Sequence, residues 1–504
     1  MTILTASRLT FIMSRIVLLF LVLVAVAWCD DYPAPPATFD ASENTRWSSS
    51  EVKGSRRADI NVQFTASDGS ADSVKMIRVD LVGTPYERGY AHGSLLTSEI
   101  AEFAGPALDK FVVQEVMNLS FEKVRNTFYG HSEMLITTHN TSTTSPAQTK
   151  NLPEAVQKFL LDVKKAGASL APKVFRKALT WVWTTQIDYT PQYIKEEIDG
   201  LAEGMCSKLG DKCDVNEWRA TLQSVNMFPE LVRMACTAFG AWGRSMRDPS
   251  TLIQLRALDF GSGPWAGSTV VQVHRGDPAN PDHAFVSVAF PGFVGAITGV
   301  AQNGVGISEK VWMTYDPRSL QPGTFKGEAD VFVLRDLLNF AKSRADGEQM
   351  VQQAKRTWAI WIGLGDFATK TFDLVGYKES SAVVYTDETI GTMTGQPYLE
   401  DITYVDKHPQ PSGDGVNGTL PSALEHFYGK IDQDAIKQIV QHHQTGDVHW
   451  ALYDFGANQM QLAIGKTNSD GYFGPPGSTE NSDAYKAFSR PTLRFDLEDL
   501  WQGK

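Results

Sequence analysis

Residues 234–243, which mark the point where predicted helices give way to predicted strands, read Met-Ala-Cys-Thr-Ala-Phe-Gly-Ala-Trp-Gly. Small side chains flank Cys236, so a backbone carbonyl or a bound molecule can approach its thiol closely. A polar turn at 247–250 separates this run from the apolar run 252–260, and the two are predicted to pair as strands. Such a hairpin brings Arg256 and Asp259 back beside Cys236. The stretch therefore predicts a thiol, a guanidinium and a carboxylate at one end of a sheet.

The spacing of Arg256 and Asp259 poses a geometric question. Positions three apart on a regular strand face opposite ways. Either the strand bulges or ends between them, or one of the two residues has only a structural role. A structural ion pair between Arg256 and Asp259 is the simple alternative to a catalytic role for both.

The rest of the chain divides at the same point. Before Met234, amphipathic periodicity predicts mainly helices, at 84–100, 152–166, 172–185 and 194–209, with one strand at 77–82 and a loose leader at 28–60. After it, strands are expected at 269–274, 284–289, 295–300, 304–308 and in hairpins at 372–386 and 448–464, with helices at 331–340, 348–356 and 433–442. This order favours an α+β fold in which antiparallel sheets are stacked, with helices on the outside.

Composition and the N-terminal residues limit the class of protein. The chain has 504 residues, of which 42% are hydrophobic and 21% charged, as in globular proteins. Its net charge of −12 argues against a nucleic-acid partner. Arg8 and Arg15 precede an apolar run that ends in Ala-Val-Ala at 25–27, which predicts a signal peptide over residues 1–27. The alternative, a short membrane anchor, is disfavoured because a spanning helix needs about 20 apolar residues; no later transmembrane segment is expected.

Sequons and cysteines fit a secreted or lysosomal glycoprotein. Asn118, Asn140 and Asn417 each begin a glycosylation sequon. Cys206 and Cys213 bracket a short polar turn and are the expected disulfide pair in an oxidising compartment. Cys29 lies at the predicted new N-terminus, which leaves Cys236 as a lone thiol, either buried and inert or reactive.

Five motifs in order resemble one known family. Cys-Thr-x-Phe-Gly at 236–240 followed by Arg-Ala-Leu-Asp-Phe at 256–260 resembles the start of the mature chain in the penicillin acyltransferase, bile salt hydrolase and acid ceramidase group. The resemblance also covers 83–93 (GTPYERGYAHG), 196–204 (EEIDGLAEG), 302–307 (QNGVGI) and 334–338 (LRDLL). It spans roughly residues 77–465 and, with the signal peptide and sequons, is strongest to acid-ceramidase-like glycoproteins of protists. It implies the four-layer αββα fold of N-terminal-nucleophile hydrolases.

The resemblance also implies a reaction. The chain would cut itself between Ala235 and Cys236, and the freed α-amino group, with an ordinary pKa near 8, would accept the thiol proton. Arg256 would hold the thiolate, Asp259 would orient the amine, and Asn303 would stabilise the oxyanion. The chains 28–235 and 236–504 would stay associated. No cofactor is expected, and the substrate would be a small-molecule or lipid N-acyl amide such as ceramide, attacked to give a thioester.

Alternatives remain open at this point. Where the family usually supplies a second asparagine and a second arginine, this chain has Gln-Pro-Tyr at 396–398 and Thr-Tyr-Val-Asp-Lys-His at 403–408. An N-acyl amino acid, peptide or lactam substrate, acyl transfer to an amine, a phospholipase-B-like activity, and a non-catalytic secreted ligand-binding glycoprotein are therefore retained. His442, His443 and His449 lack the spacing of a metal motif, and no serine-hydrolase elbow, P-loop or dinucleotide fingerprint is found.

Overall fold

The computed structural model describes residues 32–66, 69–112, 171–232, 235–260, 267–277, 280–302, 304–312, 324–407, 420–469 and 471–504. The description below concerns the compact unit Pro35–Lys504. The predicted signal peptide, the helix at 152–166, the sequon residues Asn118, Asn140 and Asn417, and the candidate Asn303 lie outside the described residues.

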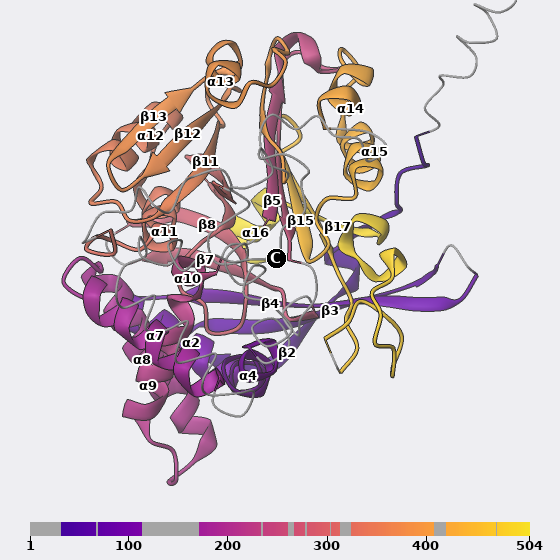
Figure 1. The fold of residues 1–504 in the computed structure, drawn as a ribbon. Helices are drawn as coiled ribbons and strands as arrows, with labels where there is room; N and C mark the ends of the chain where they lie inside the picture. Colours follow the sequence, from indigo (N-terminus) through magenta and orange to yellow (C-terminus); the bar gives the residue numbers. More distant parts are fainter. Residues whose placement is uncertain are drawn as a thin grey trace, which may run out of the picture. The chain divides into compact units, whose positions relative to one another are not determined.

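Ten strands form the larger sheet, in the order β13-β12-β11-β10-β9-β8-β7-β4-β3-β2 (Figure 1). They are β2 (Thr45–Val52), β3 (Ser55–Thr65), β4 (Ala71–Val82), β7 (Val270–Asp277), β8 (Asn280–Ala289), β9 (Thr298–Ala301), β10 (Val305–Val311), β11 (Ala359–Asp366), β12 (Phe372–Lys378) and β13 (Ser381–Tyr385). Neighbouring strands run antiparallel except β4 and β7, which pair in parallel with Ile77 opposite Val270. The sheet therefore joins strands from both sides of Cys236.

Seven strands form the second sheet, in the order β1-β17-β16-β15-β6-β5-β14. They are β1 (Thr38–Asp40), β5 (Ala235–Trp242), β6 (Leu252–Asp259), β14 (Ile402–Val405), β15 (His449–Asp454), β16 (Gln459–Ile464) and β17 (Thr492–Asp496). Only the short β1–β17 pair is parallel. The strand that carries Cys236, β5, thus lies between β6 and β14.

The two sheets pack face to face through alternating apolar side chains. One buried cluster joins Ala238, Tyr453 and Leu462 of the seven-stranded sheet to Val273, Val286 and other residues of the ten-stranded sheet. Gly240 has no room for a side chain, because an added Cβ would overlap the ring of Phe372. This close approach explains the glycine in the Cys-Thr-x-Phe-Gly motif.

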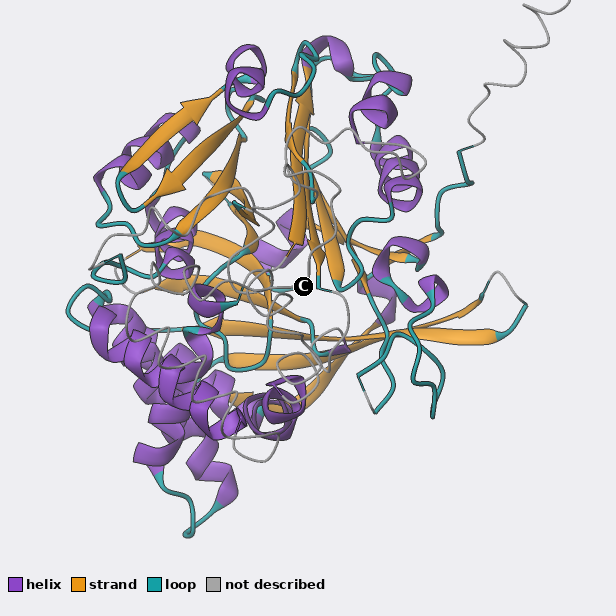
Figure 2. Cartoon of the chain, in the orientation of Figure 1, coloured by secondary structure: helices purple, strands orange, loops and turns teal. Residues whose placement is uncertain are grey.

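Helices cover the outer faces (Figure 2). On the ten-stranded sheet lie α2 (Pro85–Leu95), α8 (Gln192–Leu209), α11 (Asp330–Phe340) and α12 (Arg344–Gln353), joined by α3 (Thr97–Glu102), α4 (Leu108–Phe111), α7 (Ala171–Gln186), α9 (Val215–Asn226) and α10 (Phe228–Leu231). On the seven-stranded sheet lie α14 (Leu420–His426) and α15 (Gln433–His443), whose Gln433 donates to Asp454 of β15. Two shorter helices, α13 (Asp387–Thr394) and α16 (Leu497–Gln502), follow β13 and β17. The architecture is the expected four-layer αββα sandwich.

Two of the sequence motifs are explained by one helix contact. Gly89 and Gly93 of α2 face Gly200 and Gly204 of α8 so closely that a Cβ on any of them would overlap the backbone of the other helix. A Cβ at Gly89, for example, would overlap the carbonyl oxygen of Glu197. The motifs at 83–93 and 196–204 are therefore a helix-packing signature.

The predicted elements after Met234 are largely confirmed, whereas the N-terminal leader is not. Residues 28–60 were expected to be loose, but 38–65 contain β1, β2 and β3, which complete both sheets. These strands are rich in polar residues because β2 and β3 lie at a sheet edge with one face in solvent. The strands β11, β14 and β17 and the two parallel pairings were not predicted.

Candidate active site

Cys236 lies near the start of β5, on the face of the seven-stranded sheet that meets the other sheet. The β5–β6 register pairs Ala235 with Asp259, Cys236 with Leu258 and Ala238 with Arg256, without a break. A bulge or strand end between Arg256 and Asp259, one of the two alternatives, is therefore wrong, and the two side chains lie on opposite faces. Arg256 shares the inner face with Cys236.

A buried guanidinium links the thiol to a carboxylate. Arg256 Nη2 lies 3.4 Å from Cys236 Sγ and 3.0 Å from Glu309 Oε2, and Glu309 Oε2 lies 3.9 Å from the thiol. Arg256 Nε also donates to the Glu309 carbonyl at 3.2 Å, and Nη1 lies 3.2 Å from His449 Nε2. All four side chains are buried. Because an arginine only donates, His449 Nε2 is an acceptor and its proton resides on Nδ1, which has no hydrogen-bond partner in the described structure.

In the unbroken chain the thiol is held in its neutral form. Burial raises the pKa of Cys236 to about 12, although the positive charge of Arg256 acts in the opposite direction. Burial also raises the pKa of Glu309, which Arg256 counteracts, and lowers the pKa of the neighbouring Lys310. A thiol in this state is a poor nucleophile until a proton acceptor is supplied.

Asp259 occupies the outer face, opposite the Ala235 end of β5. Its carboxylate accepts hydrogen bonds from Thr445 Oγ1 at 2.6 Å and from the Gly446 amide at 2.8 Å, and Lys407 Nζ lies 3.7 Å away. Thr445 Oγ1 also lies 2.8 Å from Thr237 Oγ1. Because the Thr445 hydroxyl has one proton, Thr237 donates to Thr445 and Thr445 to Asp259. A short chain of hydroxyls thus fixes the carboxylate beside the Ala235–Cys236 segment.

The segment expected to carry a second asparagine and arginine lies next to the thiol. Residues 402–405 form β14, which pairs with β5 so that Val405 is opposite Ala238. Gln396 Nε2 donates to the Tyr404 carbonyl, which secures this edge strand, and the Lys407 amide donates to Thr237. In this chain a lysine, Lys407, is the cation that faces Asp259.

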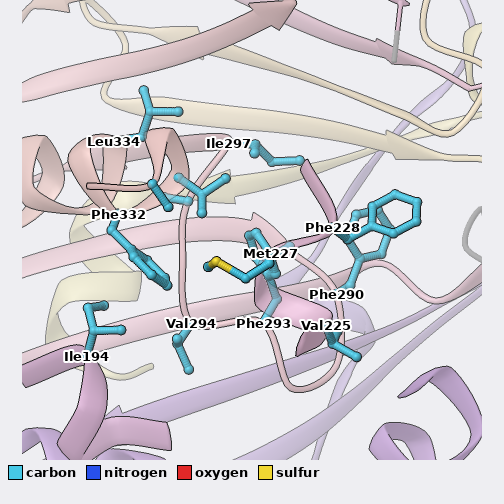
Figure 3. Packing of buried hydrophobic residues seen from close by; sticks show 14 of the residues in the cluster. Ile194, Val225, Met227, Phe228, Phe290, Phe293, Val294, Ile297, Phe332 and Leu334 are labelled. Carbon is cyan, nitrogen blue, oxygen red and sulfur yellow. The ribbon is translucent and has the colours of Figure 1, made fainter. Parts of the chain in front are cut away.

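An apolar cavity begins one strand away from Cys236. It is lined by Leu258, the residue opposite Cys236, and by Phe290, Phe293, Ile297 and Val448, with Phe103, Val225, Phe228, Pro229 and Phe260 completing the wall. About 420 Å³ of space, part of it open to solvent, lies among these side chains. Figure 3 shows Val225 and Phe228, which precede Cys236 in the chain, gathered with Phe290, Phe293 and Ile297, which follow it. The cavity is therefore built from both sides of the Ala235–Cys236 bond.

Sequence reasoning missed three residues of this site. Glu309 and Thr445 were not singled out, and His449 was considered only as a metal ligand. A charged Glu-Lys pair at 309–310 in a short strand that is otherwise without charge was the available signal for Glu309. His449 and Thr445 lie almost 200 residues after the hairpin, and only the β6–β15 pairing, with Leu258 opposite His449, brings them there.

The structure also bears on the expected disulfide, the candidate metal ligands and the expected lack of a membrane span. Cys206 and Cys213 form a disulfide, and Cys236 is a buried free cysteine. His443 Nε2 lies 2.7 Å from Asp406 Oδ1. Among the residues of the described ranges, no group of three or more histidine, cysteine, aspartate or glutamate side chains is arranged to hold a metal ion. Within the same ranges, every helix is too short or too polar to cross a membrane.

The chain is similar to several known proteins in sequence or in part of its fold. No profile of a known protein family matches the chain. Partial likeness was found to two solved structures, a Caenorhabditis elegans N-acylethanolamine-hydrolyzing acid amidase ortholog and the R18L variant of conjugated bile acid hydrolase from Clostridium perfringens. The first is 14% identical with a TM-score of 0.33, covering 44% of this chain and 93% of that chain. The second is 9% identical with a TM-score of 0.30, covering 45% and 89%.

Two curated proteins of Dictyostelium discoideum match over most of their length. Protein dcd1B is 27% identical over 405 residues, 79% of this chain and 70% of that protein. Protein dcd1A is 31% identical over 436 residues, 84% of this chain and 85% of that protein. The αββα chain with its buried Cys236 therefore belongs to the family of the Dictyostelium dcd1 proteins.

Proposed function

We propose that this chain is an N-terminal cysteine amidohydrolase that activates itself by cleaving the Ala235–Cys236 bond. The single observation that carries the proposal is the 3.4 Å contact between Arg256 Nη2 and Cys236 Sγ; both side chains are fully buried, and Cys236 lies near the start of β5. A guanidinium in this position stabilises a thiolate, and a purely structural cysteine has no need of it.

The activation step uses groups that lie around the bond. The Cys236 sulfur attacks the Ala235 carbonyl carbon, a C–S bond forms, and the C–N bond breaks as the nitrogen takes a proton. Water then hydrolyses the thioester, which leaves a carboxylate on Ala235 and a free amine and thiol on Cys236. Glu309, whose pKa is raised by burial, lies 3.9 Å from Sγ and is placed to take the thiol proton in the precursor. Asp259, opposite Ala235 in register, is placed to orient the new amine.

The mature site would use the same sulfur on an N-acyl amide. The amine of Cys236 accepts the thiol proton, the thiolate attacks the substrate carbonyl, and water releases the acid from the thioester. The apolar side chains of Leu258, Phe290 and Phe293 beside Cys236 would favour an apolar acyl chain, and a lipid amide such as ceramide is the substrate that we infer. Asn303 remains the proposed oxyanion donor.

The two products of cleavage are proposed to stay together in a secreted or lysosomal glycoprotein. The parallel pairing of β4 with β7 and the seating of β1 beside β17 place strands of the 28–235 chain in both sheets. Glu230, a few residues before the cut, accepts hydrogen bonds from the Asp330 amide at 2.9 Å and from Thr357 Oγ1 at 2.9 Å. The Cys206–Cys213 disulfide supports an oxidising compartment.

The test is a comparison of the parent with Cys236→Ala and Cys236→Ser. Parent protein secreted from a eukaryotic host is expected to give two fragments, with the larger beginning at Cys236, and to release fatty acid from N-acyl lipids. Cys236→Ala is expected to stay in one piece and to release none. Because Cys236→Ser keeps the shape but replaces the thiol with a weaker nucleophile, a hydroxyl, slow cleavage of this variant would identify the attacking atom. Full activity of an unbroken Cys236→Ala chain would refute the proposal.

A further inference from the structure

A second cavity lies on the far side of the ten-stranded sheet from Cys236. It is bordered by Arg88 of α2, Tyr193 of α8, His274 and Arg275 of β7, Phe285 of β8 and Phe340 of α11. About 690 Å³ of space lies among these side chains, part of it open to solvent. None of its lining residues lines the apolar cavity beside Cys236.

His274 presents a hydrogen-bond donor without a partner at this cavity. Arg335 Nη2 lies 3.2 Å from His274 Nδ1, and because arginine only donates, Nδ1 is the acceptor. The ring proton must then reside on Nε2, which has no hydrogen-bond partner among the described residues. The side chain is 2% exposed and its ring stacks on Phe285, with centroids 4.4 Å apart. A buried N–H that is left unsatisfied destabilises the fold, so a ligand that accepts a hydrogen bond from it is favoured.

The charge around the cavity favours an anion. Arg88 and Arg275 line it, together with His274 and His283, and none of the described lining residues has a carboxylate. The neighbouring carboxylates are already shared between several guanidinium groups. Glu197 lies 3.2 Å from Arg335 and 3.9 Å from Arg88, and Asp80 lies within 3.6 Å of three arginines, Arg56, Arg78 and Arg275. Asp336 is a further acidic neighbour of Arg335, and Tyr193 donates a hydrogen bond to it.

The remaining lining is apolar. Pro85 and Phe285 form the walls, and Phe340, with 54% of its surface exposed, lies at the rim. The ring of Tyr193 packs edge-on against Phe340, with centroids 6.0 Å apart. Inorganic anions would gain nothing from these rings, whereas an organic anion with a short apolar body would bury it against them.

We propose that this cavity is a binding site for an organic carboxylate, whose head accepts a hydrogen bond from His274 Nε2 beside Arg88 and whose apolar body lies against Phe285 and Phe340. The site is separate from Cys236 and requires no cleavage of the chain.

The experiment uses the full-length protein and two probes, pentanoate and inorganic phosphate, in NMR and calorimetric titrations. Pentanoate is expected to bind and to shift the His274 ring N–H signal, which His274→Phe would identify by its disappearance. His274→Phe keeps the stacking on Phe285 but is expected to weaken pentanoate binding at least tenfold. The same substitution at the exposed His426 is the control and should leave the affinity unchanged.

A second pair of variants does not depend on a buried position. Phe340→Asp places a negative charge at the exposed rim, and Phe340→Asn is its neutral match. Pentanoate should bind at least tenfold more weakly to Phe340→Asp than to Phe340→Asn. Equal affinities of these two variants, an unshifted His274 signal, or binding of phosphate in preference to pentanoate would each overturn the assignment.

Discussion

Two buried clusters in this molecule are built from the same three residue types. Arg256 lies 3.0 Å from Glu309 and 3.2 Å from His449, and Arg335 lies 3.2 Å from Glu197 and 3.2 Å from His274. Both arginines are fully buried. The first cluster lies between the sheets and contacts Cys236, whereas the second lies between a sheet and its helices and contacts no nucleophile among the described residues. Under the proposed function, a buried Arg-Glu-His group is not a catalytic signature by itself, and the thiol near the start of β5 distinguishes the first cluster from the second.

The largest expected effect comes from breaking the second cluster. Arg335→Met leaves Glu197 buried with only the more distant Arg88, and removal of one partner of a buried ion pair typically lowers the free energy of unfolding by about 3–5 kcal/mol. Urea denaturation measures the loss. The folded fraction should still cut itself at a rate within a few-fold of the parent. If self-cleavage stops in folded Arg335→Met, the proposal that only the first cluster takes part in the reaction is wrong.

The matching change in the first cluster should act on the reaction. Arg256→Met removes the charge that stabilises the thiolate, and loss of such electrostatic stabilisation slows a reaction by on the order of 10²–10³-fold. The readout is the time course of fragment formation on a gel, made on protein whose circular dichroism shows it to be folded. An Arg256→Met chain that cleaves as fast as the parent would assign Arg256 a structural role.

A smaller effect is expected from the hydroxyl that holds Asp259. Thr445→Val keeps the volume but removes the 2.6 Å hydrogen bond, and a hydrogen bond to a charged group contributes about 1.5–3 kcal/mol. If Asp259 orients the Cys236 amine as proposed, the pH profile of the cleaved enzyme should shift, because a misplaced carboxylate would no longer set the protonation of that amine. Thr445→Ser is the control and should restore the profile. An unchanged profile in Thr445→Val would show that the hydroxyl only stabilises the fold.

A pH dependence of stability also distinguishes the two clusters. Burial raises the pKa of Asp447, next to Asp259, to about 7, and burial raises the pKa of Glu328, next to Asp336 and the second cluster, to about 8. A carboxyl whose pKa is raised on folding stabilises the protein fully below its unfolded value near 4, and this contribution is lost as the pH rises through 7 or 8.

The free energy of unfolding should therefore fall between about pH 4 and pH 8, by at most about 1.4 kcal/mol per pH unit for each group. Asp447→Asn should flatten the curve up to pH 7, and Glu328→Gln should flatten it up to pH 8. Chemical denaturation across this range provides the measurement. A curve that both variants leave unchanged would show that these carboxyls are ionised in the native state.

The parts of the fold that the sequence predicts are those with local signals. The hairpin 372–386 and the helix at Gln433–His443 have clear periodicity or turn residues, and both are confirmed. The contact of Arg256 with Cys236 was predicted because both lie in one hairpin. Glu309 and Thr445 were missed because they come from other strands and loops, and long-range pairing leaves no trace in the local pattern. The strands at 45–65 were missed because a strand at a sheet edge with one solvent-exposed face has as many polar residues as a loop.

The parallel pairing of β4 with β7 determines how the mature protein would unfold. A scission at residue 235 removes one covalent link but none of the hydrogen bonds between residues 77–82 and 270–275. The fragments would share a single cooperative unfolding transition, so heating would denature them together instead of releasing one from the other. Mixing two separately produced fragments would then be a poor route to active enzyme, since neither could complete its sheet alone.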